Sequence, residues 1–438
     1  MDYFHYKNGR LFCEEADADA LAGAHGTPLY VYSARTILEH YRKLRDAFTT
    51  PKGAEGSPSG PPVICYSVKA NSSLSILKMM AKEGSGFDVV SGGELYRALK
   101  VGADPRKIVY AGVGKSDEEI VAGLRAGILL FNIESEEELE NVDRLAGKLG
   151  KTADVALRIN PDVDPATHVY ISTGKRETKF GVDLQRAEEL LKDARRLKRV
   201  RMAGLHVHIG SQITKTDPYV DTLNRLVDFV PRVRALGHPL EWLDLGGGFG
   251  IWYKDKSARP AAEIASVCLP LVAKTGLKLI VEPGRFIVGN AGILLTRVLY
   301  MKDSGDKKFA ICDAGMHDLI RPALYGAYHR IWPAAADPSL QGPPPDEEQW
   351  PGSTVTCDVV GPICESADFL AKDRRLPPMK RGDLLAVFSA GAYGYVMSSN
   401  YNTFPRPAEV LVSGSASRLV TKRQTYDDVL AAEKIESF

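Results

Sequence analysis

Short apolar runs and amphipathic segments follow one another in a regular order along most of the chain. The apolar runs are rich in β-branched residues and predict buried strands at 63–68, 86–90, 108–111, 128–133, 153–159, 203–208, 241–245 and 278–282. Between them, apolar residues recur with helical spacing at 72–83, 92–100, 116–126, 135–149, 183–197, 217–236 and 260–275, and a helix at 34–48 precedes them all. This alternation predicts an α/β domain, a (β/α)8 TIM barrel.

An open, doubly wound sheet is the alternative for the same pattern. Such a sheet would carry a glycine-rich fingerprint after its first strand, and no such fingerprint follows Val68. Two other nucleotide motifs also fail. Ile251 stands where the last glycine of a GxGxxG motif should be, and Val109 stands where the first glycine of a Walker A loop ending in Gly114-Lys115-Ser116 should be.

After about residue 285 the helical spacing gives way to β-rich runs punctuated by turns, at 292–300, 354–360 and 384–388. These runs predict a second, all-β domain, an antiparallel β-sandwich or barrel. A strand at 28–32 needs a partner sheet and is expected to join it. We therefore predict a barrel domain over 34–284 and a β domain over 1–33 and 285–438. The stretches 50–62 and 332–351 are rich in Pro, Gly and polar residues and are expected to be long loops.

Composition narrows the range of partners. The 56 Lys and Arg residues almost cancel the 55 Asp and Glu residues, so no overall charge favours nucleic acid or an anionic membrane. No apolar run has the length of a membrane span, and the first residues do not resemble a signal peptide. The six cysteines include no CxxC pair, which argues against a zinc site or a disulfide scaffold. We expect a cytoplasmic protein that acts on a small molecule, unless a targeting peptide has been removed.

Lys69 follows the first barrel strand, Val63 to Val68, and should stand at its carboxyl end. An amine at the mouth of a buried sheet is partly desolvated, which lowers its pKa and prepares it for Schiff-base chemistry. Considered alone, such a lysine is more often a surface side chain with its stem buried.

The loops after the seventh and eighth strands carry Gly246-Gly247-Gly248 and Glu282-Pro283-Gly284-Arg285. These loops form the usual phosphate site of a TIM barrel, and glycines and an arginine suit a dianion. A triple glycine by itself is more often a plain turn, but here both loops carry suitable residues.

His206 and His208 end the sixth strand, and alternation places them on the same side. They suggest a metal site, but the sequence offers no clear carboxylate as third ligand. Contact between His208 and a flat cofactor ring is an equally good reading, and His206 can be structural.

Together these groups call for an aldehyde at Lys69, a phosphate at the glycines, a flat ring at His208 and a ring nitrogen at Glu282. Pyridoxal 5'-phosphate has all four features. A carboxylate beside the pyridine nitrogen keeps it protonated, so that the ring can accept an electron pair from Cα.

The motifs that carry these residues resemble those of the fold type III, alanine racemase-like pyridoxal phosphate decarboxylases. They are Tyr66-Ser67-Val68-Lys69-Ala70-Asn71, Phe87-Asp88-Val89-Val90-Ser91-Gly92-Gly93-Glu94, His206-Val207-His208-Ile209-Gly210-Ser211-Gln212 and the two phosphate loops. The stretches 316–325, 361–366 and 390–395 are similar to the diaminopimelate decarboxylase branch, and Glu365-Ser366 replaces the aspartate motif of ornithine decarboxylases.

The resemblance implies a role for each matched residue. Lys69 would form the Schiff base and Cys364 would return a proton to Cα. The implied cofactor-binding residues are Lys69, Asp88, His208, Ser211, Gly247, Gly248, Glu282, Pro283, Gly284, Arg285 and Tyr393. The implied substrate-binding residues are Arg285, Arg321, Tyr325, Glu365 and Tyr393. In this family Cys364 and Glu365 come from the neighbouring subunit, so the resemblance implies a homodimer with shared active sites.

The expected reaction is decarboxylation of meso-2,6-diaminopimelate to L-lysine, the last step of lysine biosynthesis. Three alternatives stay open at this point: a decarboxylase of another basic amino acid such as ornithine or arginine, a non-catalytic relative that binds a regulatory partner, and a lysine Schiff-base aldolase. The last has no need of Glu282 or of the β domain.

Overall fold

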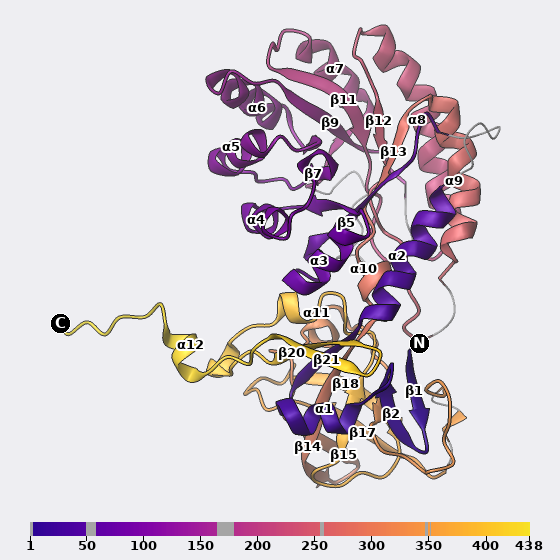
Figure 1. The fold of residues 1–438 in the computed structure, drawn as a ribbon, viewed down its shortest axis with the longest axis vertical. Helices are drawn as coiled ribbons and strands as arrows, with labels where there is room; N and C mark the ends of the chain where they lie inside the picture. Colours follow the sequence, from indigo (N-terminus) through magenta and orange to yellow (C-terminus); the bar gives the residue numbers. More distant parts are fainter. Residues whose placement is uncertain (1–2, 50–57, 164–178, 255–257, 347–348, 351) are drawn as a thin grey trace. The chain divides into compact units, whose positions relative to one another are not determined.

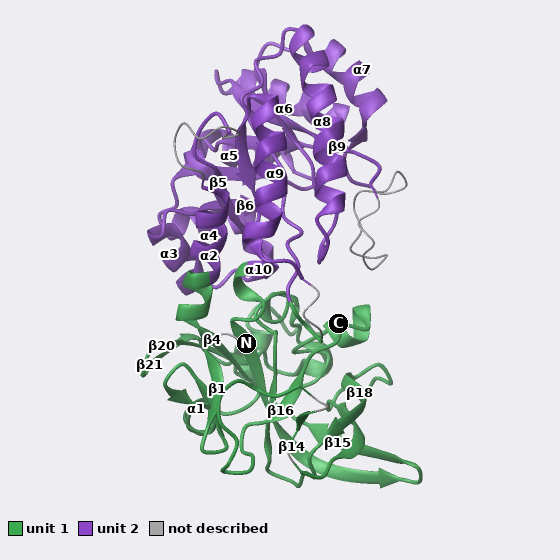
Figure 2. Ribbon diagram, turned by 90° about the vertical axis from the view of Figure 1, so that its right-hand side faces the viewer, with its two compact units in different colours: residues 1–39, 252–256, 287–438 green, residues 40–251, 257–286 purple. Residues whose placement is uncertain are grey.

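The computed structural model describes residues 3–49, 58–163, 179–254, 258–346, 349–350 and 352–438. The chain forms two compact units, coloured separately in Figure 2. The barrel unit comprises His40–Ile251 and Ser257–Phe286, and the sheet unit comprises Met1–Glu39, Trp252–Lys256 and Ile287–Phe438. Each unit is described by itself below.

The barrel unit is a closed ring of parallel strands. Figure 1 shows helices on both sides of these strands. The strands of the ring are β5 (Val63–Ser67), β6 (Gly86–Val89), β7 (Ile108–Tyr110), β8 (Leu130–Ile133), β9 (Ala153–Asn160), β11 (Val200–His206), β12 (Trp242–Asp244) and β13 (Lys278–Val281). Each pairs in parallel with the next, and β13 closes the ring on β5 with Ile280 opposite Val63. A two-residue strand, β10 (Val182–Asp183), adds to β9. The predicted eight-stranded barrel is confirmed.

Helices alternate with the barrel strands, as the periodicity predicts, and one helix precedes the first strand. They are α2 (Ala34–Phe48), α3 (Leu74–Lys82), α4 (Gly92–Lys100), α5 (Asp117–Ala126), α6 (Glu136–Lys148), α7 (Leu184–Ala194), α8 (Asp217–Ala235), α9 (Ala261–Thr275) and the short α10 (Arg285–Val288). Three of them begin with the same signal, Ser-x-x-Glu. The hydroxyls of Ser91, Ser116 and Ser135 each accept the backbone N–H of the glutamate three residues later. This capping satisfies helix donors close to the carboxyl ends of the strands.

Inside the barrel, an apolar layer lies below a polar one. Fully buried residues from six strands form the apolar layer: Cys65, Val109, Leu130, Ala156, Ala203 and Ile280. Side chains alternate along a strand, so the residue two positions further on takes the same direction. For four of these strands that residue is polar and buried: Ser67, Asn132, Arg158 and Glu282. The strand pattern therefore places a polar layer at the carboxyl ends of the strands.

The sheet unit contains a nine-stranded sheet and a small three-stranded one. The larger sheet contains β4 (Leu29–Ser33), β14 (Gly292–Ser304), β15 (Lys307–Cys312), β16 (Ile331–Pro333), β17 (Val355–Val360), β18 (Phe369–Leu376), β19 (Leu384–Val387), β20 (Ala408–Ser413) and β21 (Ala416–Thr421). The smaller contains β1 (Phe4–Lys7), β2 (Arg10–Cys13) and β3 (Ala16–Asp17). The described helices are α1 (Ala18–His25), α11 (Arg321–Tyr325) and α12 (Tyr426–Leu430).

The predicted N-terminal strand does join this sheet, since β4 lies between β14 and β20. Most pairs are antiparallel, as predicted, but β15 with β17 and β4 with β20 are parallel. Neither pair is joined by a hairpin. A long connection separates β15 from β17, and β4 and β20 come from opposite ends of the chain, so nothing local imposes the antiparallel direction.

The segment predicted as a polar loop at 332–351 begins inside the sheet. Trp332 is fully buried, and its indole N–H donates to the carbonyl of Pro345 at 3.1 Å. Its ring stacks on Trp350 with centroids 4.6 Å apart. Residues 347, 348 and 351 of this segment, and 50–57 of the other predicted loop, lie outside the described residues.

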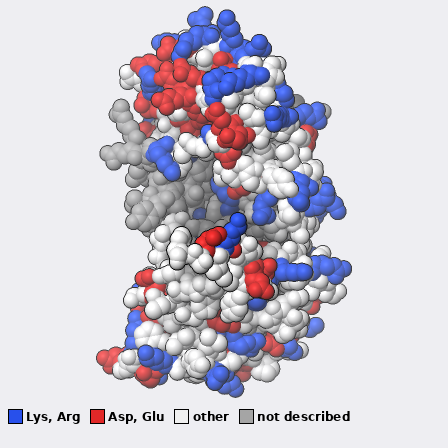
Figure 3. All heavy atoms as spheres, turned by 90° about the vertical axis from the view of Figure 1, so that its left-hand side faces the viewer, with Lys and Arg blue, Asp and Glu red and all other residues white. Residues whose placement is uncertain are grey.

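Acidic and basic side chains are interspersed on the face shown in Figure 3. Ion pairs also join neighbouring helices of the barrel unit, among them Arg144 with Asp117 at 2.6 Å and Arg186 with Glu136 at 2.5 Å. Of the helices in the described part of the chain, none is both long enough and apolar enough to cross a membrane.

Candidate active site

Lys69 stands where the sequence predicts, in a 3₁₀ turn (Val68–Ala70) directly after β5. Its Nζ lies 2.5 Å from Oδ2 of Asp88, which lies on β6 and also accepts the hydroxyl of Ser67 at 2.7 Å. The Lys69 side chain is 36% exposed, whereas Asp88 is completely buried. The amine can therefore be reached from solvent while its carboxylate partner cannot.

Asp88 is a stronger base than an ordinary aspartate. Burial and the charge of Glu282 raise the pKa of Asp88, and Lys69 opposes that rise. The other carboxylate oxygen, Oδ1, is buried and has no hydrogen-bond partner among the described residues. A buried acceptor left open in this way is expected where a ligand completes the site.

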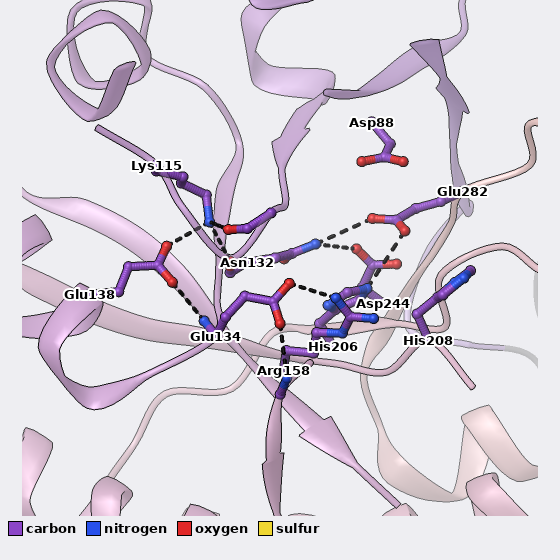
Figure 4. A network of polar contacts seen from close by, with 12 residues as sticks. Asp88, Lys115, Asn132, Glu134, Glu138, Arg158, His206, His208, Asp244 and Glu282 are labelled. Carbon is purple, nitrogen blue, oxygen red and sulfur yellow. Dashed lines mark hydrogen bonds and ion pairs between the residues drawn. The ribbon is translucent and has the colours of Figure 1, made fainter. Parts of the chain in front are cut away.

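Glu282 follows β13 and is 4% exposed. Asn132 donates to its Oε1 at 3.3 Å, and His206 Nε2 lies 3.6 Å from its Oε2, within ion-pair reach but too far for a hydrogen bond (Figure 4). Burial alone would raise the pKa of Glu282, but the nearby His206 and the charge of Lys69 outweigh burial and lower the pKa. Glu282 is therefore a buried carboxylate that stays ionised.

Asp244, at the end of β12, behaves in the opposite way. Burial and the neighbouring Glu282 carboxylate raise the pKa of Asp244 well above its ordinary value. Its Oδ2 accepts from Asn132 at 3.2 Å, and its Oδ1 accepts the backbone N–H of Gly246 at 2.9 Å. Two buried carboxyl groups share one amide donor, and only one of them is readily ionised.

The glycine loop after β12 needs its glycines. Gly246 and Gly248 have φ of 64° and 91°, a region that favours glycine. A Cβ on Gly247 would collide with the carbonyl oxygen of Glu282, and one on Gly284 would lie 3.0 Å from the Cβ atoms of Ser67 and Ala70. Side chains other than hydrogen would therefore displace these loops.

Two backbone donors remain open at these loops. In the part of the chain that the structure describes, the N–H groups of Gly248 and Gly284 donate to no protein acceptor. They belong to the loops after the seventh and eighth barrel strands, where TIM barrels hold phosphate. Pro283 and Arg285 flank Gly284, and Arg285 is 8% exposed at the start of α10.

The loop after β11 is tied to the glycine loop. The N–H of Ile213 donates to Gly248 at 2.8 Å, and the N–H of Gly250 donates back to Ile213 at 3.1 Å. Ser211 lies in this loop and is half-buried. His208, also in it, accepts the N–H of Gly247 on Nδ1 at 3.1 Å. Burial and the charges of Arg158 and Lys69 lower the pKa of His208 to about 3, so its ring is neutral and Nε2 carries the proton.

A buried network that the sequence did not reveal surrounds this centre (Figure 4). Lys115, with 1% of its side chain exposed, donates to Glu138 at 2.6 Å and to the Asn132 carbonyl at 2.8 Å. Arg158 donates to Glu134 at 2.5 Å, and both side chains are buried. A sequence signal for Asn132 and Arg158 did exist, because each is a polar residue at an inward position of an otherwise apolar strand.

The structure also supplies what the sequence lacked for a metal site. Ligand atoms of His206, Asp244 and Glu282 all lie within 4.8 Å of one another. The expectation that no carboxylate stands near His206 as a third ligand was therefore wrong. The donor set is mixed, however, because the Asn132 amide nitrogen, a hydrogen-bond donor, already binds both carboxylates.

The remaining predicted residues belong to the sheet unit. Arg321 and Tyr325 lie on α11, and Arg321 is 6% exposed. Its guanidinium bonds His329 Nε2 at 2.8 Å and lies 4.9 Å from the centre of the Tyr253 ring. His329 and Tyr253 were not singled out from the sequence.

Cys364, Glu365 and Tyr393 also belong to the sheet unit. Cys364 is the exposed one of six free cysteines, and its backbone N–H donates to Asn402 Oδ1 at 3.0 Å. Glu365 accepts the Tyr401 hydroxyl at 3.2 Å. Tyr393 has a φ of 56°, unusual for a residue with a side chain and a sign of local constraint.

The barrel unit fits pyridoxal phosphate on its own geometry. It offers an accessible amine, an ionised buried carboxylate, a neutral imidazole and two open N–H donors beside an arginine.

Comparison with known proteins supports the same cofactor. Residues 36–289 match the family model described as "Pyridoxal-dependent decarboxylase, pyridoxal binding domain". The chain belongs to the pyridoxal phosphate-dependent decarboxylases.

Similarity over the full length narrows the family. The chain is 45% identical over 429 residues to diaminopimelate decarboxylase from Aquifex aeolicus (98% of this chain, 96% of the relative) and 47% identical over 423 residues to that from Neisseria meningitidis (97% and 98%). A crystal structure of the enzyme from m. jannaschii with L-lysine matches with a TM-score of 0.91 and 38% identity, covering 99% of this chain and 98% of that one. The chain belongs to the diaminopimelate decarboxylase family.

Proposed function

We propose that this protein removes carbon dioxide from meso-2,6-diaminopimelate to give L-lysine, the last step of lysine biosynthesis. The observation that carries this proposal is the set Lys69, Asp88 and Glu282 on three barrel strand ends, in a chain about 45% identical to diaminopimelate decarboxylases over nearly its whole length. Relatives crystallised with L-lysine support the product.

When bound, pyridoxal phosphate supplies an aldehyde and a ring that takes up the electron pair released with carbon dioxide. Glu282 would face the ring nitrogen, and the neutral ring of His208 would pack on the cofactor. The phosphate would be held by Ser211, Gly247, Gly248, Gly284 and Arg285, with Pro283 shaping the loop. The ionised state of Glu282 suits this role, because a protonated ring nitrogen needs a carboxylate beside it.

Lys69 must lose a proton before its amine can act as a nucleophile. Asp88 Oδ2, 2.5 Å from Nζ, is positioned to accept that proton. Burial raises the pKa of Asp88, which brings its basicity closer to that of the amine. Ser67 donates to the same oxygen and fixes the direction of the carboxylate.

The residues predicted to bind the substrate would select it by its two charged ends. Arg321, Arg285 and Tyr325 would bind the distal carboxylate of diaminopimelate, since a guanidinium binds a carboxylate with two donors. Glu365 would bind its distal ammonium group, and Tyr393 would contact both cofactor and substrate. Cys364 would return a proton to Cα after carbon dioxide leaves. We propose that Cys364 and Glu365 act in the active site of a partner subunit, in a homodimer.

A substrate comparison tests the activity. Purified protein with pyridoxal phosphate should release L-lysine from meso-diaminopimelate much faster than it decarboxylates ornithine or arginine. Lys69→Ala should abolish turnover, whereas Lys78→Ala, a lysine of α3 that donates to the Val101 carbonyl, should not. Turnover of ornithine or arginine without lysine release would favour the alternative decarboxylase.

A mixing experiment tests the shared sites. Lys69→Ala and Cys364→Ala proteins, each inactive or slow alone, should regain activity when their subunits exchange, because one composite site then has both residues. Sedimentation should show a dimer. Dimers that exchange subunits without regaining activity would exclude a composite site.

We also propose a cytoplasmic location, in keeping with six cysteines that all remain free thiols. Cell fractionation tests this proposal.

A further inference from the structure

Four hydrogen bonds form a closed ring between the glycine loop and Glu282, and Figure 4 shows the two that Asn132 donates. Gly246 N–H donates to Asp244 Oδ1 at 2.9 Å, and Asn132 Nδ2 donates to Asp244 Oδ2 at 3.2 Å. The same Nδ2 donates to Glu282 Oε1 at 3.3 Å, and Glu282 N–H donates back to the Gly246 carbonyl at 2.7 Å. Neither carboxylate can turn without breaking a bond of this ring.

Asn132 is the side chain that joins the two carboxylates of this ring. It is completely buried, and its amide nitrogen has two hydrogens, one for each carboxylate. The amide oxygen cannot take that place, because it would face the ionised carboxylate of Glu282, which only accepts. The Asn132 backbone is held as well, since the buried amine of Lys115 donates to its carbonyl at 2.8 Å.

The ring has two routes from the glycine loop to Glu282, and they do different things. The backbone route, from Gly246 to the N–H of Glu282, fixes the main chain only. The side-chain route, through Asp244 and Asn132, fixes the rotation of the Glu282 carboxylate. Of the two, the second can pass a change in the loop to the carboxylate oxygens.

A cation held by His206, Asp244 and Glu282 is the competing explanation for this cluster. Such an ion would have to bind beside the Asn132 amide, whose hydrogens already lie against both carboxylates and would repel a cation. The geometry therefore favours the amide as the group that holds the two acids together.

We propose that Asn132 is a positioning residue that couples the loop receiving the cofactor phosphate to the carboxylate facing the cofactor ring. The inference rests on the proposed function, because it takes the roles of the glycine loop and Glu282 from it. Asn132 touches neither substrate nor cofactor in this scheme; it acts through Asp244 and Glu282.

The test compares two ligands on the apoenzyme: pyridoxal phosphate and pyridoxal, which lacks the phosphate. Binding is followed by the absorbance of the bound ligand, so turnover is not needed. Asn132→Leu keeps the size of the side chain and removes both donors. It should weaken pyridoxal phosphate binding roughly tenfold to a hundredfold, the loss expected for one hydrogen bond to a charged group, the bond to Glu282. Binding of pyridoxal should weaken less. The ratio of the two affinities, which measures how much the phosphate contributes to binding, should therefore fall.

Asn141→Leu is the matched control, because Asn141 also donates to an aspartate, Asp117 at 2.9 Å, but on helix α6. It should leave both affinities unchanged. Asp244→Asn is a second variant, which keeps an acceptor for Gly246 and interrupts the same route. It should lower the ratio of the affinities for pyridoxal phosphate and pyridoxal in the same way.

Two results would overturn the coupling. One is an unchanged ratio of the two affinities in either folded variant, which includes equal weakening of both ligands. The other is failure of both variants to fold, because the ring would then be a requirement of the fold. The proposed function fails separately, if wild-type protein binds pyridoxal phosphate but releases no lysine from diaminopimelate.

Discussion

His329 should control how well the enzyme recognises the distal carboxylate of its substrate. Its Nδ1 lies 2.8 Å from the carbonyl oxygen of Phe388, which can only accept, so Nδ1 carries the proton. Nε2 is then an acceptor and takes a hydrogen from Arg321 at 2.8 Å. The ring of Tyr253, edge-on to His329 with centroids 5.6 Å apart, covers the guanidinium. Arg321 is thus held by a histidine of fixed tautomer.

The loss of substrate recognition on removing the His329 side chain has an upper limit that can be calculated. A hydrogen bond to a charged group contributes about 1.5–3 kcal/mol. If all of it goes into orienting Arg321, His329→Ala raises KM for diaminopimelate by roughly tenfold to a hundredfold. The cofactor-binding residues of the barrel unit are untouched by this change, so affinity for pyridoxal phosphate should stay the same. His329→Gln, whose amide oxygen can accept from Arg321, should recover most of the loss.

Steady-state rates of lysine release give kcat and KM, and ligand titration gives the cofactor affinity. His238→Ala is the control, because His238 also bonds a backbone carbonyl, that of Leu191 at 2.7 Å, in the barrel unit. The reasoning would be refuted by a folded His329→Ala protein with unchanged KM, or by one in which cofactor affinity falls as much as substrate recognition.

Three further predictions concern the cofactor site and stability. Gly247→Ala should abolish tight pyridoxal phosphate binding because its Cβ collides with the Glu282 carbonyl, whereas Gly93→Ala, with 3.8 Å to the nearest side-chain atom, should bind normally by absorbance titration. Glu134→Ala should lower the free energy of unfolding by about 3–5 kcal/mol, because it leaves Arg158 buried and unpaired. Asp117→Ala, which breaks an exposed pair, should cost much less in the same urea titration. Burial raises the pKa of Asp318 to about 8. Between about pH 4 and pH 8 the native state therefore keeps a proton that the unfolded chain loses. The free energy of unfolding falls as pH rises through this range. Asp318→Asn should therefore raise the melting temperature more at pH 8 than at pH 4.5, and an equal gain at both would contradict this.

The barrel could be predicted from the sequence because its signals are local. Each strand is an apolar run, and several helices begin with Ser-x-x-Glu, so strand ends and helix starts can be read residue by residue. The sheet unit is harder, because its pairings join distant segments. Nothing near β4 indicates that β20, close to the other end of the chain, runs parallel to it.

The candidate site shows the same division between local and distant signals. Lys69 and the glycine loop are visible in the sequence because special residues follow buried strands. The support of Arg321 is not, because Tyr253 and His329 reach it from separate segments with no shared pattern. Likewise, no spacing shows that Asp244 and Glu282 will share one amide donor.

One rule would nevertheless have found much of the missing layer. In the barrel strands that carry Cys65, Leu130, Ala156 and Ile280, the next inward residue is polar. Burying four such groups is costly unless each is bonded, so a polar residue at an inward strand end implies partners on neighbouring strands. Applied to Asn132, this rule predicts a bonded network from the strand pattern alone. Because three of these groups stand on strands and Glu282 directly follows one, their positions are fixed before the cofactor arrives.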